Sequence, residues 1–157
     1  MAGLGSIIEL RNRVTDVKNG LDGHVFVQRI IRDDEPYICY MNAEGQLFEE
    51  GVNRLGVKLS DFAPYSPRTI EIKKAKGQPT DRVTLRDTGD FHSSFHVEVG
   101  PDRFEIKASD WKTEKLLKKY GMGILGLTQE NLAELIWQYI YPDLLKTTRD
   151  IIINGTI

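Results

Sequence analysis

The chain has 157 residues, of which 40% are hydrophobic and 28% charged, so it is long enough and ordinary enough to bury a core as a single domain. Its one cysteine, Cys39, excludes an intrachain disulfide and a cysteine metal cluster, and favours a reducing compartment. The net charge of −2 does not support a dedicated nucleic-acid binder, and no stretch approaches the roughly 18 apolar residues that would predict a membrane span.

The N-terminal region predicts a helix. Ser6 and Glu9 form a Ser-x-x-Glu capping box. Apolar residues then recur at helical spacing, and Gly20 or Gly23 can end the run; these apolar residues are Leu4, Ile7, Ile8, Val14, Val17 and Leu21. Residues 24–33 fit either a second short helix or a strand, and Asp33-Asp34-Glu35-Pro36 ends that element.

The middle of the chain predicts strands separated by loops. Tyr37 to Met41 is rich in residues that favour strands and is followed by the breaker Asn42-Ala43-Glu44-Gly45. Residues 46–68 contain two glycines and two prolines, which indicates mostly loop. Shorter strands are expected at 69–72 and around 83–85, with a basic turn between them.

A β-hairpin over residues 95–108 has the clearest pattern. Apolar and polar residues alternate on both sides of the connection Gly100-Pro101-Asp102-Arg103. Before it, Phe91 and Phe95 are four residues apart, which fits one helical turn leading into the first strand. We expect one face of the hairpin to be buried, formed by Phe95, Val97, Phe104 and Ile106.

Two helices are expected after the hairpin. The first is short and basic, begins at Asp110 or Thr113 and stops at Gly121. The second is capped by Thr128, and its buried stripe consists of Leu132, Leu135, Ile136, Tyr139 and Ile140. Strands between helices at both ends predict an α+β fold: an antiparallel sheet with an N-terminal helix and C-terminal helices packed on it.

The C-terminal pattern changes at Pro142. Counted at about 100° per residue, Trp137, Tyr141 and the apolar residues beyond the proline fall on the side opposite the buried stripe. One interpretation is a break at Pro142, with a second helix packed on the same domain. The other is that residues 142–157 form an arm that packs on a neighbouring subunit, with an interface of Trp137, Tyr141, Leu144, Leu145, Ile151 and Ile152.

Three segments carry a resemblance to a known family. They are Tyr65-Ser66-Pro67-Arg68-Thr69 followed by Lys73-Lys74, the run from Leu85 to Phe95 that contains Asp87-Thr88-Gly89-Asp90, and Ile124-Leu125-Gly126-Leu127-Thr128. In order and spacing, across about residues 45–141, they resemble the tail-completion (virion morphogenesis) proteins of tailed bacteriophages. The chain departs from that pattern at Lys118-Lys119-Tyr120-Gly121, where the family often has His-x-x-Gly. A fainter similarity points to neck or ring proteins of crAss-like gut phages.

The resemblance implies a structural protein rather than an enzyme. Such a protein forms a homomeric ring at the head–tail junction or tail end, assembles in the host cytoplasm and remains in the virion. Its partners are copies of itself and other neck, portal or tail proteins, and it uses no cofactor.

Asp87-Thr88-Gly89 is also the signature of aspartic proteases, in which two such loops place aspartates that share a proton. Here Arg86 precedes it and Asp90 follows it, and both charges would disturb a shared proton. We therefore expect a structural turn in which Asp87 accepts backbone N–H bonds. A protease using this triplet is the enzymatic alternative.

Basic residues cluster at Lys73, Lys74, Lys76 and Arg82. Such a cluster is usually a solvated face, but in a ring it can contact the phosphates of packaged DNA without reading sequence. A non-specific DNA-binding accessory protein is thus a second alternative.

Two further patterns predict no site. His92 and His96 have the spacing of metal ligands on a helix, but no third ligand is evident. Gly121-Met122-Gly123-Ile124-Leu125-Gly126 fits the dinucleotide spacing, but it follows a helix instead of a strand. No metal or cofactor is expected.

Overall fold

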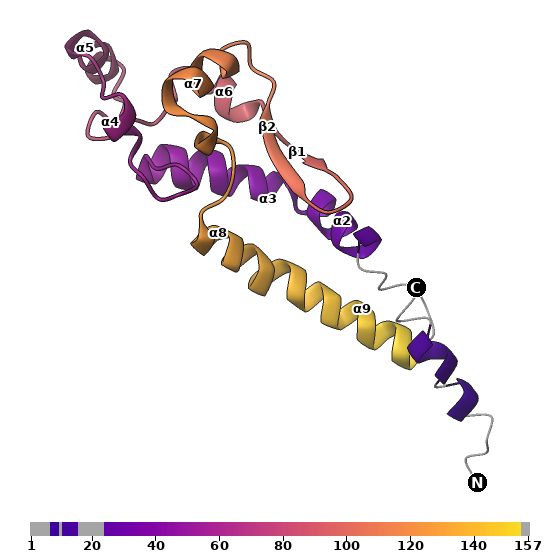
Figure 1. Ribbon diagram of the computed structural model, residues 1–157. Coiled ribbons are helices and arrows are strands. Elements are labelled where there is room, and N and C mark those ends of the chain that lie inside the picture. The colour runs from indigo at the N-terminus through magenta and orange to yellow at the C-terminus, as the bar shows by residue number, and fades with distance from the viewer. Residues whose placement is uncertain (1–6, 10, 16–23, 155–157) are drawn as a thin grey trace.

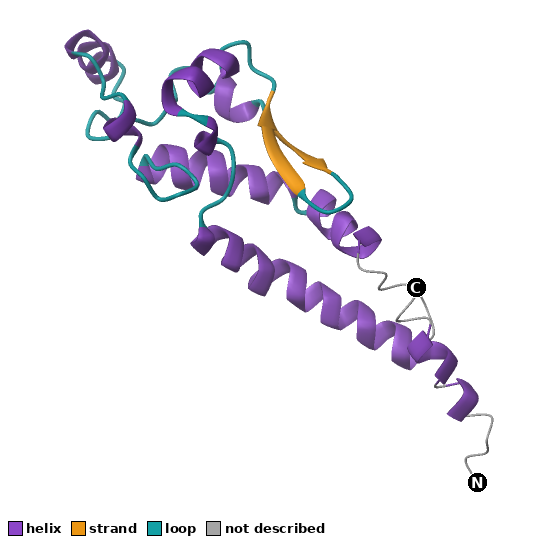
Figure 2. Cartoon of the chain, viewed as in Figure 1, coloured by secondary structure: helices purple, strands orange, loops and turns teal. Residues whose placement is uncertain are grey.

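The structure is a computed structural model that describes residues 7–9, 11–15 and 24–154 (Figures 1 and 2). Residues 7–9 and 11–15 are helical, as predicted, and Ile7, Ile8 and Val14 are exposed there. The predicted cap at Ser6, the apolar positions Leu4, Val17 and Leu21, and the stops Gly20 and Gly23 lie outside the described residues.

The fold is α+β, as the sequence predicts. Its sheet has two antiparallel strands, β1 (Phe95–Val99) and β2 (Phe104–Ala108). The first half contains α2 (His24–Asp33), α3 (Glu35–Tyr40), the π-helical segment η1 (Met41–Glu50), α4 (Leu59–Phe62), α5 (Pro67–Ala75) and α6 (Asp90–Ser93). After the sheet come α7 (Thr113–Tyr120), the 3-10 turn η2 (Met122–Ile124), α8 (Gln129–Glu134), the π-helical segment η3 (Leu135–Ile140) and α9 (Tyr141–Asn154).

Three predicted strands are wrong. Residues 37–41 belong to the helix formed by α3 and η1, because Pro36 lies in its first turn, where a proline favours helix over strand. Residues 69–72 lie inside α5, whose start is fixed by Ser66 accepting from the Thr69 N–H at 3.2 Å. Residues 83–85 lie outside helices and strands.

The segment 42–45 does not break the chain; it continues the helix. Gly51 ends η1 in a left-handed conformation with φ 68°, and its N–H donates to the Gln46 carbonyl five residues back. A Cβ at Gly51 would lie 3.1 Å from the Val83 carbonyl, so the end of η1 packs closely on the segment 82–83. The predicted loop at 46–68 is therefore shorter and holds α4.

The hairpin forms in the predicted position. β1 and β2 pair with Val97 opposite Ile106 and Val99 opposite Phe104, so the predicted apolar residues share one face. Phe95 and Ile106 are buried, and Val97 and Phe104 pack partly buried against the core. Before β1, α6 supplies the expected helical turn, and the Phe91 ring meets the Phe95 ring edge-on at 5.0 Å.

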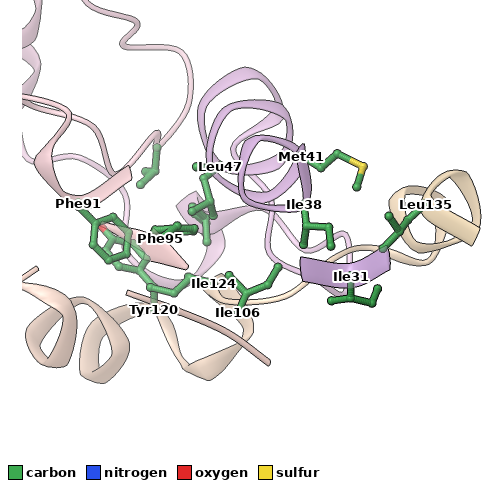
Figure 3. Close-up of a cluster of buried hydrophobic side chains, with 13 residues drawn as sticks. Ile31, Ile38, Met41, Leu47, Phe91, Phe95, Ile106, Tyr120, Ile124 and Leu135 are labelled. Atoms are coloured by element: carbon green, nitrogen blue, oxygen red, sulfur yellow. The ribbon is translucent and has the colours of Figure 1, made fainter. Parts of the chain in front are cut away.

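The core gathers side chains from most described elements (Figure 3). Ile38 and Leu47 come from the long helix of α3 and η1, Tyr120 from α7 and Ile124 from η2. Leu135 of η3 is fully buried and joins the C-terminal helix to this core. These residues hold the hairpin, α7 and α8 against one helical axis.

Two fully buried amide side chains fasten the connection before α8. Asn42 accepts from the Gly126 N–H at 3.0 Å and donates to the Ile124 carbonyl at 3.2 Å. Gln46, one turn later, donates to the Gly126 carbonyl at 2.9 Å and accepts from the Thr128 N–H at 2.8 Å. Together they replace the backbone partners that the segment 124–128 lacks, and so fix where α8 begins.

The C-terminal helix, by which we mean α8, η3 and α9 together, runs without interruption past Pro142 (Figure 1). Of the two interpretations of this segment, the break at Pro142 is therefore wrong, and the arm on a neighbouring subunit stays a prediction. The wider π-helical turn of η3 ends just before the proline, with the Tyr141 N–H donating to Ile136 five residues back. Such a turn relieves the clash of the proline ring with the preceding turn. It also changes the directions of the side chains that follow it, relative to those of a regular α-helix with about 100° per residue.

Candidate functional site

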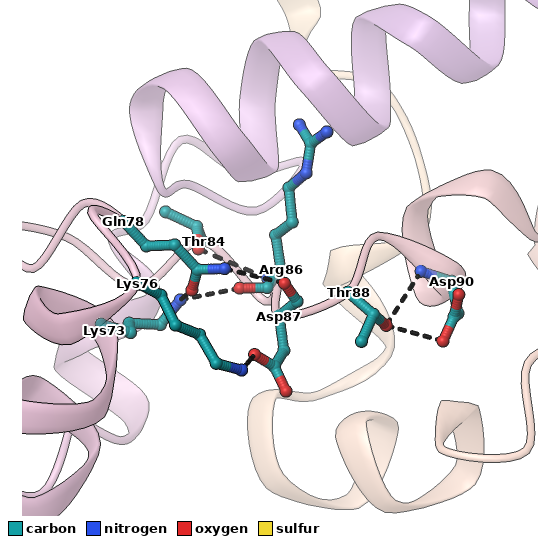
Figure 4. Close-up of polar contacts among 8 residues, drawn as sticks. All are labelled: Lys73, Lys76, Gln78, Thr84, Arg86, Asp87, Thr88 and Asp90. Atoms are coloured by element: carbon teal, nitrogen blue, oxygen red, sulfur yellow. Dashed lines mark hydrogen bonds and ion pairs between the residues drawn. The ribbon is translucent and has the colours of Figure 1, made fainter.

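The turn at Asp87, Thr88 and Gly89 is present, but Asp87 does not act as predicted. Its carboxylate accepts from the Lys76 ammonium instead of from backbone N–H groups (Figure 4). That hydrogen bond lowers the pKa of Asp87, which keeps the carboxylate ionised. The local turn is made by Thr88, which donates to the Asp90 carboxylate at 2.6 Å, and by Gly89 with φ 102°. A carboxylate held ionised by a lysine is unlike the shared-proton dyad of aspartic proteases.

Lys73 is buried, unlike the other residues of the basic cluster. Its ammonium donates to the Arg86 carbonyl at 2.7 Å and to Gln78 Oε1 at 3.0 Å (Figure 4). It also lies 5.1 Å from the centre of the Tyr65 ring. These partners compensate the desolvated charge and tie α5 to the segment before α6. Lys73 therefore points inward, not toward a phosphate outside.

Of the remaining basic residues of the cluster, Lys74 and Lys76 are exposed and Arg82 is half-buried, and two of the three are paired. Lys76 bonds Asp87, and Arg82 bonds Asp81 at 2.8 Å and donates to the Phe48 carbonyl. Lys74 is exposed on α5. Pairing with carboxylates reduces the positive field that a DNA phosphate would meet.

The two histidines lie in different elements, so their spacing is not that of ligands on one helix. His92 is in α6, and its Nε2 lies 3.0 Å from the Thr84 carbonyl, while His96 is a half-exposed residue of β1. His92 Nδ1 has no hydrogen-bond partner and lies 3.6 Å from Glu44 Oε1. Among the described residues, no group of three His, Cys, Asp or Glu side chains could hold a metal ion.

The predicted interface residues lie on the C-terminal helix and differ in exposure. Trp137 is 64% exposed, Tyr141 43% and Leu145 51%, and the Trp137 and Tyr141 rings meet at 5.3 Å. Leu144 and Ile152 are half-buried, and Ile151 is helical. Of the predicted buried stripe, Leu135 is buried, but Ile136 is 40% exposed and joins the exposed surface.

The C-terminal helix is attached to the body through its first half. Leu135 is fully buried, and Tyr37 of α3 donates to Glu134 Oε1 at 2.6 Å, while its ring lies tilted against the Tyr139 ring with centroids 4.4 Å apart. The hydrogen bond to Glu134 raises the pKa of Tyr37 above its usual range. At the far end, Arg13 donates to the carbonyls of Ile152 and Ile153, which lie in the last turn of α9. Between these contacts, Trp137, Tyr141 and Leu145 lie on the surface.

Sequence reasoning missed the polar residues that position this helix. The local pattern predicts Asn42 as part of a breaker and Gln46 as a loop residue, although their spacing of four residues places both on one helical face. The Ser66-Pro67 pair, a helix cap followed by a proline at the first position, was the signal that α5 is helical.

No protein-family model, curated protein or solved structure matches this chain. Within the part of the chain that the structure describes, no helix is long and apolar enough to cross a membrane.

Proposed function

We propose that this chain is a structural protein of a tailed-phage virion that forms a homomeric ring at the head–tail junction or tail end. In this proposal the C-terminal helix supplies the contact between subunits, and other neck, portal or tail proteins dock on the ring. The protein acts by binding its neighbours, in the host cytoplasm during assembly and then in the virion.

The observation that carries the proposal is the exposed apolar surface of the C-terminal helix. Trp137 and Tyr141 form a contiguous aromatic pair, with Ile136, Leu145 and Ile153 exposed on the same helix. Aromatic residues beside aliphatic ones are typical of the centre of a protein interface, and a large exposed apolar patch is uncommon on a monomer.

The virion assignment rests on the resemblance of residues 45–141 to tail-completion proteins. The three segments of that resemblance coincide with helix starts: Ser66 caps α5, the Thr88–Gly89 turn precedes α6, and Thr128 caps α8. The resemblance thus concerns positions that shape the backbone, which is where a short motif has a physical reason to recur.

The oligomeric state of the purified chain tests the proposal. Light scattering after size exclusion should give a homo-oligomer, and electron microscopy should show closed rings. Replacing the aromatic pair (Trp137→Ser with Tyr141→Ser) should release folded monomers, because truncating interface anchors removes most of the binding free energy. The matched control is Ile72→Ser on α5, where an equally exposed apolar residue lies off the proposed contact. A wild-type chain that stays monomeric at high concentration contradicts the proposal.

A further inference from the structure

The C-terminal helix presents an acidic face. Residues 129–143 contain Glu130, Glu134 and Asp143 but no lysine or arginine. Glu134 bonds Tyr37, whereas Glu130 and Asp143 are exposed and have no ion pair within the described part of the chain.

An apolar cavity opens beside this acidic face. It has a volume of about 490 Å³ and is enclosed by α2, the hairpin and the C-terminal helix. Val27 and Ile31 line it on one side, and Leu132, Ile136 and Ile140 on the other. Its aliphatic lining suits an aromatic side chain, which would occupy part of this volume.

Helix α7 presents the opposite charge. Lys112, Lys115, Lys118 and Lys119 stand there against a single acid, Glu114, which bonds Lys118 at 2.7 Å. Lys115 and Lys119 are exposed four residues apart, and no described carboxylate pairs with either. Trp111, just before the helix, is 82% exposed with the Lys112 ammonium 5.4 Å from its ring centre.

Within the described chain, no ion pair joins the two faces. Figure 1 shows α7 on one side of the long helix of α3 and η1, and the C-terminal helix on the other. Pairing two copies through their acidic faces would place carboxylates against carboxylates, which opposes association. Pairing the acidic face of one copy with α7 of the next instead joins opposite charges, and such a head-to-tail contact closes into a ring when the rotation allows.

We infer that the ring contact is head-to-tail: Trp111 and the lysines of α7 on one copy dock on the acidic face and its apolar cavity on the next. This inference rests on the proposed function and names the surface that meets the C-terminal helix. Trp111 enters the cavity, and Lys115 and Lys119, one turn apart on α7, lie together toward one end of the acidic face, at Glu130 or at Asp143, which are 13 residues apart along the helix.

Charge reversal on each face, separately and together, tests the contact on the full chain. One variant carries Lys115→Glu and Lys119→Glu, the other Glu130→Lys and Asp143→Lys, and circular dichroism verifies that both fold. Each alone should assemble at least about tenfold more weakly, because it sets like charges against each other. An equimolar mixture should assemble again, because alternating copies restore an acid–base pair at every contact. The charge-matched control, Asp61→Lys with Glu71→Lys on α4 and α5, should assemble like wild type.

The outcomes separate the inference from the proposed function. If wild type assembles and the Trp137/Tyr141 variant does not, but either charge reversal leaves assembly intact, the head-to-tail contact is overturned and the ring proposal stands. A mixture that stays monomeric also overturns the contact. Loss of DNA binding with unchanged assembly in the Lys115/Lys119 variant would assign α7 to a nucleic acid instead.

Trp111→Ser should weaken assembly without unfolding the chain; normal assembly in this variant contradicts the role given to the cavity.

Discussion

At the level of single residues, the burial of His92 in α6 should make the stability of the fold depend on pH. Its Nε2 faces the Thr84 carbonyl at 3.0 Å, so that nitrogen carries the proton in the neutral ring. Nδ1 then faces Glu44 without a hydrogen bond. Burial lowers the pKa of His92, and the nearby Glu44 carboxylate only partly opposes that effect. Neutral His92 is therefore the form that the fold favours.

The sign of the resulting pH dependence follows from proton uptake. Below the ordinary histidine pKa of about 6.5, the unfolded chain takes up a proton that the folded chain does not. The free energy of unfolding should therefore fall as pH drops through about 6.5, until the lowered folded pKa is reached. In His92→Gln the side chain can still donate to Thr84 but does not titrate. Denaturant melts of this variant between pH 7 and 5 should therefore lose the pH dependence of the free energy of unfolding. His96→Gln should keep it, and an unchanged slope in His92→Gln would show that another group titrates.

Lys73 makes a second prediction at this scale. Lys73→Met keeps the length of the side chain but leaves the Arg86 carbonyl and Gln78 Oε1 without their donor. The free energy of unfolding should fall by about 1–3 kcal/mol, the usual range for an unsatisfied buried partner. Lys74→Met on the exposed side of α5 should change it by about 0.5 kcal/mol or less. Equal effects of the two changes in urea melts would contradict the buried role of Lys73.

At the level of elements, the hairpin was predictable and the helix of α3 and η1 was not. Alternation over 95–108 is a local signal, because both strands and their connection lie within one short stretch. Within residues 37–50 the buried side chains include the polar Asn42 and Gln46 as well as Ile38 and Leu47. The two polar residues interrupt the apolar periodicity that would predict a helix. Their partners lie about 80 residues later, and no local pattern can show them.

The hairpin predicts an order of effects. Phe95→Ala should destabilise the protein by about 3–5 kcal/mol, since the ring is buried against Phe91. Phe104→Ala should cost clearly less, because Phe104 is only partly buried on the outer end of the same face. Thermal or urea melts of the two variants measure which change destabilises the protein more. If Phe104→Ala proves the more costly change, the face of the hairpin that meets the core has been misassigned.

Gln46 tests how the segment before α8 is held. Gln46→Glu keeps the acceptor for Thr128 but, when ionised, cannot donate to the Gly126 carbonyl, and it buries a charge at a fully buried position. At pH 7 we expect a loss of several kcal/mol. Burial raises the pKa of such a carboxyl above its unfolded value, so the loss should shrink as pH falls toward 4. A deficit independent of pH would mean that the changed side chain has left the buried site.

At the level of the whole molecule, the sequence predicts the α+β class and places Trp137 and Tyr141 off the buried stripe, but it does not predict the path of the C-terminal helix. The count at 100° per residue assumes a regular α-helix. The π-helical turn of η3 breaks that assumption just before Pro142, and it comes from backbone hydrogen bonds that composition does not reveal. For this reason the sequence count places Ile136 on the buried stripe and leaves a break at Pro142 as one of two interpretations.

Ending the chain after Tyr141 separates folding from assembly. The truncation removes Pro142 to the end and so most of α9, whose main packing within the described chain is on η3 of the same helix. Among the side chains of this helix whose burial the structure describes, Leu135 is the last buried core residue, and Tyr139 and Ile140 pack partly buried against the core. Far-ultraviolet circular dichroism should therefore show a folded domain that still melts cooperatively, with helix lost only in proportion to the residues removed. Light scattering should show a monomer, because Leu145 and Ile153 are gone and the aromatic pair lies at a frayed helix end. A shortened chain that assembles like wild type would move the subunit contact away from α9. One that unfolds outright would show that α9 stabilises the domain itself.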